Sequence, residues 1–141
     1  MKKALWLLAV LALSGCETPV TKDEMDAYNY GPKPANWQDE IRSYLSLRLR
    51  DPKSAIVEFR TEPKQFYQRQ VALDPEQHGW AVCVWVNDKN GEGAYEGFRP
   101  MTFFLRNEKI VAANNDPDHR GPIYAEYAKR QCASLGAPFK E

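Results

Sequence analysis

The two histidines are the side chains of this 141-residue chain best suited to acid–base chemistry near neutral pH, because imidazole titrates there. His78 follows Glu-Gln, and His119 follows Asp-Pro-Asp. A histidine base needs a nucleophile or a substrate group within reach. None of the serines lies in the Gly-x-Ser-x-Gly pattern of a nucleophile elbow. Both histidines are expected in polar loops. The sequence therefore predicts a protein that is not an enzyme, with a small periplasmic hydrolase using a histidine or paired carboxylates as the alternative.

Oxygen-rich loops offer a second kind of chemistry, the binding of a calcium ion. One candidate loop contains Asn114, Asn115, Asp116 and Asp118, and the other is the run 87–92. Neither run matches the twelve-residue calcium loop. Asn, Asp and Gly also accept the backbone angles that tight turns need. We therefore predict turns at both places, with no metal and no cofactor.

The polar segment 87–99 is the candidate contact loop. Apolar segments on either side are predicted strands, so the sheet would hold both ends of the loop, and loops on rigid scaffolds often carry binding sites. The loop would offer two amides, an amine and an aromatic ring, those of Asn87, Asn90, Lys89 and Tyr95. The alternative is a plain hairpin connection whose asparagines bond their own backbone.

The start of the chain has the parts of an export signal. Two lysines precede an apolar run of about ten residues, which is too short to cross a bilayer as a helix. The next four residues, Leu13-Ser14-Gly15-Cys16, resemble the lipobox of bacterial lipoproteins at every position. An ordinary cleaved signal is the alternative.

The lipoprotein resemblance implies a signal peptide over residues 1–15 and an acylated Cys16 that anchors the protein in the lipid bilayer. Glu17 differs from the Asp that retains enteric lipoproteins at the inner membrane. The resemblance therefore implies the periplasmic face of the outer membrane. Residues 16–35 contain three prolines and no apolar period, and they are expected to form a flexible, lipidated tether spanning about 25 Å.

Cys83 and Cys132 remain once Cys16 is assigned to the anchor. An exported protein meets an oxidising compartment, where a pair of cysteines is usually bridged. Zinc would need three or four ligands at a recognisable spacing, which the two histidines between these cysteines do not provide. We therefore predict a disulfide between Cys83 and Cys132.

The elements that must position these residues follow from hydrophobic periodicity. Apolar residues recur at helical spacing over 37–50, after the potential N-cap Asn36 and before Asp51-Pro52. Pro122 is predicted to open a last helix, which ends before Gly136. Between the helices lie strand patterns, at 54–60, 65–73, 80–86, 99–106 and 109–113. Residues 80–86 are apolar on both faces, which indicates a central strand.

This order predicts an α+β domain over residues 36–141. An antiparallel sheet of four or five strands would carry an N-terminal and a C-terminal helix, both on one sheet face, in two layers. The chain has 19 basic and 19 acidic residues, and Lys2 and Lys3 lie in the leader, so the mature protein carries an acidic excess. That balance argues against nucleic-acid binding, which requires a basic face.

Two blocks of the domain resemble a family of small uncharacterised exported proteins of Gram-negative bacteria. The first block is Asp51-Pro52-Lys53-Ser54-Ala55, and the second is the run 82–97. The shared pattern is D-P-x-S-A followed by V-C-x-x-V-N-x-K-N, and Ala94 departs from it where the family has a second glycine before tyrosine. The resemblance implies no activity.

The sequence favours a non-enzymatic binding or assembly module. Small size, a lipid anchor, a disulfide and the lack of a catalytic pattern all fit a lipoprotein that binds another envelope protein or a cell-wall component. A structural spacer without a partner is a further hypothesis, beside the hydrolase.

Overall fold

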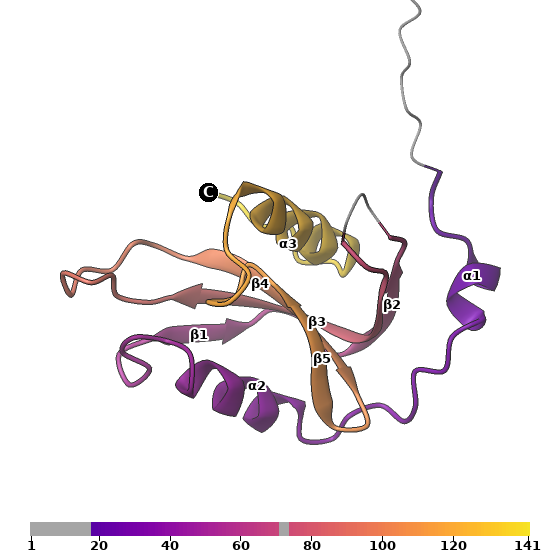
Figure 1. The fold of residues 1–141 in the computed structure, drawn as a ribbon, viewed down its shortest axis with the longest axis horizontal. Coiled ribbons are helices and arrows are strands. Elements are labelled where there is room, and N and C mark those ends of the chain that lie inside the picture. The colour runs from indigo at the N-terminus through magenta and orange to yellow at the C-terminus, as the bar shows by residue number, and fades with distance from the viewer. Residues whose placement is uncertain (1–17, 71–73) are drawn as a thin grey trace, which may run out of the picture.

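Five antiparallel strands form one sheet that lies between two long helices (Figure 1). The computed structural model describes residues 18–70 and 74–141, so Cys16 lies outside the described residues. The elements in chain order are α1 (Lys22–Asp26), α2 (Trp37–Ser46), β1 (Ile56–Phe59), β2 (Lys64–Gln68), β3 (Gln77–Asn87), β4 (Arg99–Arg106), β5 (Lys109–Asn114) and α3 (Pro122–Ser134). The predicted α+β fold, with a helix before and after an antiparallel sheet, is confirmed.

Strand β3 organises the sheet, as its two apolar faces predict. It pairs on one side with β2 along its first half and with β1 along its second half. Its other side pairs with β4, and β5 follows at the edge. Both faces of β3 are fully buried where it crosses the core, at Val82, Val84 and Val86 on one face and Ala81 and Cys83 on the other.

The helices cover opposite faces of the sheet, and the prediction that both lie on one face is wrong. Ile41 and Leu45 of α2 pack in the core cluster that contains Val84. Cys132 of α3 and the following Leu135 pack in a second cluster on the other face, with Cys83. Because β3 is apolar on both faces, each face requires a cover, and the molecule has three layers.

Residues 18–35 contact the domain, although the sequence predicted a flexible tether over 16–35. This segment includes the short helix α1 and passes one end of the sheet, from β2 to the turn between β4 and β5 (Figure 1). Long-range hydrogen bonds fix it at several points, from Arg69 to Glu24 and Thr18, from Trp80 to Tyr30, and from Ala35 and Asn36 to Glu108. Its partners come from distant strands and turns, so local composition does not reveal them.

Two further differences concern the ends of elements. The strand predicted over 65–73 begins one residue earlier and ends at Gln68, and residues 71–73 lie outside the described part of the chain. Asn36 precedes α2 as predicted, but its side chain forms no capping hydrogen bond. The Glu108 carboxylate accepts from the backbone there instead. Over 18–70 and 74–141, none of the helices has the length and apolar character needed to cross a bilayer.

Candidate functional site

The asparagines of the candidate contact loop bond to the backbone of the loop itself. Asn90 Oδ1 accepts hydrogen bonds from the amides of Glu92 and Ala94, at 2.9 and 3.1 Å. Asn87 Oδ1 accepts from the amide of Gly97 at 3.1 Å. These amides hold the shape of the connection between β3 and β4, as the hairpin alternative expects. The side-chain oxygens of Asn87 and Asn90 are therefore used within the loop, and contacts with a partner would come from other side chains of the loop.

Lys89 and Tyr95 face each other across this connection. They form an isolated bridge in the backbone, and the Lys89 amine lies 5.3 Å from the centre of the Tyr95 ring. The Tyr95 hydroxyl donates to the carbonyl of Ser54 at 2.8 Å, while the residue stays 47% exposed. Tyr95 therefore ties the loop to the start of the sheet, and Lys89 lies over its ring as a cation.

The loop forms one wall of a groove of about 570 Å³. The other walls come from the end of α2 and from the loop that precedes α3. The lining residues are Arg48, Leu49, Arg50, Asp88, Lys89, Asn90, Gly91, Glu96, Arg99, Pro117 and Arg120. Five of these side chains are cationic and two are carboxylates, so the groove has an excess of positive charge although the whole chain is neutral.

Arg99 is the most buried cation of the groove. Its Nη1 lies 3.0 Å from Asp88 Oδ1, and its side chain is 15% exposed. Burial lowers the pKa of the Arg99 guanidinium from its ordinary value, while Asp88 opposes that shift. Its Nε and Nη2 atoms are buried and have no hydrogen-bond partner among the described residues. The guanidinium of Arg99 is thus held next to the groove by Asp88, and its Nε and Nη2 donors stay unpaired within the described part of the protein.

The other cations differ in how far they are neutralised. Arg48 donates to Asp118 at 2.7 Å and stacks 3.6 Å from the Tyr44 ring centre. The nearest Arg120 and Glu96 atoms are 3.9 Å apart. Within residues 18–70 and 74–141, neither Arg50 nor Lys89 forms an ion pair with a carboxylate. Hydrogen bonding to Ser54 is the main cause that lowers the pKa of the Asp51 carboxyl, and the nearby charge of Lys89 adds to it. Arg50 and Lys89 can therefore pair with an anion without breaking a direct ion pair.

His119 lies beside the groove and bonds a buried carboxylate. Its Nδ1 is 2.8 Å from Asp116 Oδ1, and Asp116 is fully buried. Asp116 also accepts from the Tyr44 hydroxyl at 2.6 Å and from the backbone amide of His119 at 3.2 Å. The pair fixes one tautomer of the imidazole and ties the loop before α3 to α2. His119 forms no hydrogen bond to a hydroxyl or thiol of the described chain.

His78 lies in β3 and not in the loop that the sequence predicted. Its ring contacts those of Tyr28 and Tyr30, with centres 4.7 and 6.1 Å away. Burial is the main cause that lowers the pKa of the His78 imidazole. The histidine therefore belongs to the aromatic contacts that hold the N-terminal segment against the sheet.

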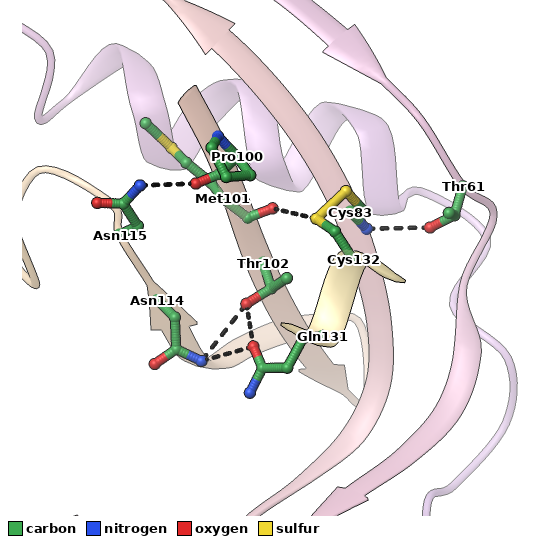
Figure 2. Close-up of a disulfide and its surroundings, with 9 residues drawn as sticks. All are labelled: Thr61, Cys83, Pro100, Met101, Thr102, Asn114, Asn115, Gln131 and Cys132. Atoms are coloured by element: carbon green, nitrogen blue, oxygen red, sulfur yellow. Dashed lines mark hydrogen bonds between the residues drawn. A yellow bond between two sulfur atoms is a disulfide. The ribbon is translucent and has the colours of Figure 1, made fainter. Parts of the chain in front are cut away.

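Asn114 and Asn115, which start one of the two candidate calcium loops, serve the fold. Asn114 is fully buried and bonds to Thr102 and Gln131, and Asn115 donates to the carbonyl of Pro100 at 2.8 Å (Figure 2). In the part of the chain that the structure describes, no three His, Cys, Asp or Glu side chains gather as a possible metal site.

The predicted disulfide is present between Cys83 of β3 and Cys132 of α3 (Figure 2). Both cysteines are fully buried. The bridge joins the central strand to the helix that covers one face of the sheet, on the face opposite α2. The disulfide therefore stabilises the packing of α3 on β3, and neither cysteine lines the groove.

Sequence reasoning found one wall of the groove and missed its charge. Lys89 was a candidate from its loop and Arg99 ends the same segment, 87–99, but Arg50 and Arg120 come from separate segments. Arg48 and Arg50 follow α2, where cations also suit the negative end of a helix. The repeated arginines of residues 48–50 were thus the available signal, and it had an ordinary structural explanation.

The lipobox and the two blocks that resemble exported proteins remain predictions. Comparison of the chain with protein-family models, with curated proteins and with solved structures found no match in any of the three.

Proposed function

We propose that the protein is a membrane-anchored envelope lipoprotein that acts as a non-enzymatic binding module, with the cationic groove as its contact surface. Cys16 would be acylated and would hold the protein at the periplasmic face of the outer membrane. The partner would be another envelope protein or a cell-wall component. The observation that carries the proposal is the groove itself. Cations from the end of α2, from the segment 87–99 and from the loop before α3 line this groove, whose volume is about 570 Å³.

The position of the groove in the molecule supports a role in binding partners from the periplasm. The chain enters the described structure at the end where α1 lies, and the connection between β3 and β4 extends from the opposite end (Figure 1). An anchor at Cys16 lies two residues before Thr18, which Arg69 holds against the domain. The groove would therefore face away from the anchoring bilayer and toward partners in the periplasm.

The hydrolase alternative has one supporting observation, the contact between His119 and Asp116. Such a pair can orient a base. However, it would need a nucleophile or an activated water on the other side of the ring. Asp116 also accepts from backbone amides of its own turn, so its burial is already explained by the loop structure. The binding module therefore remains the better supported function.

Photo-crosslinking in intact cells tests the proposal. A photoreactive residue would replace Gly91, which lines the groove and is exposed, and in a control protein it would replace Ser134, which is exposed on α3. We expect a specific crosslinked species from position 91 and none from position 134. Cys16→Ser should in addition remove the protein from the membrane fraction.

Two outcomes would count against the binding module. Equal crosslinking from both positions would show that the groove is not the contact surface. A mature-sized Cys16→Ser protein that still fractionates with membranes would contradict the lipid anchor.

A further inference from the structure

We infer that the groove binds an acidic peptide segment, whose carboxylates pair with the cations that the domain leaves free. This inference rests on the proposed binding function and adds the chemical class of the ligand. It starts from Arg50 and Lys89, which approach the groove from the α2 end and from the hairpin. Because neither forms a direct ion pair in the described chain, an incoming anion would not have to break one, and it would compete only with the more distant Asp51 for Lys89.

The charge of Arg99 is the second argument. Its guanidinium lies largely buried beside the groove, where Nη1 is 3.0 Å from Asp88 Oδ1. Its Nε and Nη2 atoms are buried as well, so a ligand in the groove would meet the charge of Arg99 and not these two donors. A carboxylate entering the groove would therefore be attracted by Arg99 in addition to Arg50 and Lys89.

The charge pattern of the groove favours spaced single charges over a dense polyanion. Asp88 and Glu96 lie among the cations, paired with Arg99 and near Arg120. A phosphate chain, with its closely spaced charges, would be repelled by these two carboxylates. Single carboxylates separated along a peptide can instead pair one at a time with Arg50 and Lys89, the two groove cations that form no ion pair within the described chain.

The size and position of the groove agree with such a ligand. A volume of about 570 Å³ falls within the range of pockets that hold ligands. The connection between β3 and β4, which lines the groove, extends from the end of the molecule opposite α1 (Figure 1). That position favours a segment in solution over the headgroups of the anchoring bilayer.

Fluorescence anisotropy on the full mature chain in neutral detergent tests the inference. The probe is a labelled decapeptide of alternating Glu and Gly. We expect saturable binding that weakens at high salt, because exposed charges are screened. Arg50→Gln combined with Lys89→Gln should weaken binding by about tenfold. The matched control is Lys53→Gln combined with Lys140→Gln, two exposed lysines outside the groove lining, and it should bind as the parent does.

Three outcomes overturn the inference. The first is no binding of the peptide by the parent chain. The second is equal binding by the two double variants, provided that both melt at the parent temperature. The third is tighter binding of tripolyphosphate or of phosphatidylglycerol vesicles than of the peptide. If crosslinking from position 91 persists in cells while the peptide fails, the acidic ligand is wrong and the binding module stands.

Discussion

At the scale of single residues, Cys83 and Cys132 do the most to connect distant parts of the chain. Cys83 lies in the middle of β3, and its backbone N–H donates to the Thr61 hydroxyl at 3.0 Å. Cys132 lies on the buried side of α3. The bridge closes a loop with a sequence separation of 49 residues. A crosslink of that length restricts the unfolded chain strongly in the entropy model of disulfide stabilisation.

Replacement of both cysteines, by Cys83→Ala and Cys132→Ala together, should lower the free energy of unfolding by about 4 kcal/mol. Urea unfolding of the parent and the double variant measures the difference. Reduction of the parent under the same conditions is the control and should give a similar loss. A double variant as stable as the oxidised parent would contradict this role, as would two free thiols in the denatured, unreduced protein.

The sequence predicted this bridge because only two cysteines remained in an oxidising compartment. It could not predict the burial of Asn114, because an asparagine at the end of a strand is also typical of a turn. Its amide donates to Gln131 Oε1 and to Gln77 Oε1, both at 2.9 Å. Such contacts depend on which helix face meets which strand, and spacing within one element does not contain that information.

At the scale of elements, α3 is held by a buried polar network as well as by the disulfide. The network joins α3 to β4 and β5 through Gln131, Thr102 and Asn114 (Figure 2). All three residues are buried. The predicted helix and its inward face were close to the structure, yet both helices were assigned to one face of the sheet. Periodicity identifies the apolar side of each element and leaves open which side of a sheet covers it.

Gln131→Ala should lower the free energy of unfolding by about 1–3 kcal/mol, because the buried Thr102 hydroxyl loses the oxygen to which it donates, while Asn114 keeps its hydrogen bond to Gln77 Oε1. Ser134→Ala is the matched control on the same helix, and as an exposed site it should change stability by less than about 0.5 kcal/mol. Thermal and urea unfolding of the two variants measure the contrast. An equal effect of both substitutions would show that the network adds nothing to stability.

At the scale of the whole molecule, the N-terminal segment decides how the domain would sit on the proposed anchor. A flexible tether over 16–35 would allow about 25 Å between domain and bilayer. With Thr18 bound by Arg69, only about 7 Å of extended chain separates it from Cys16. The proposed anchor would therefore hold the domain close to the membrane with its groove at the far end. Charged residues scattered through the segment suggested a solvated chain, because the partners of two of them lie far away in sequence, Arg69 for Glu24 and Glu62 for Lys33.

The contact between Arg69 and Glu24 makes the docking of this segment dependent on pH. The hydrogen bonds that Arg69 donates are the largest cause that lowers the pKa of the Glu24 carboxyl, from 4.5 to about 2, and the Thr21 amide adds to it. A carboxyl whose pKa is lowered by docking stabilises the docked state above its free pKa. That contribution is lost as the pH falls from about 4.5 to about 2.

Titration of the Glu24 carboxyl carbon by NMR should give a midpoint near 2 in the parent chain. Arg69→Gln should move that midpoint toward 4.5, because the carboxylate loses its cationic donor. The indole N–H signal of Trp80, which donates to the Tyr30 carbonyl at 3.1 Å, should shift as the segment loosens. Lys53→Gln, an exposed cation outside these contacts, should leave both signals as they are in the parent. A parent midpoint near 4.5, unchanged by Arg69→Gln, would mean that the segment is not held by this pair and that the domain moves on a longer tether.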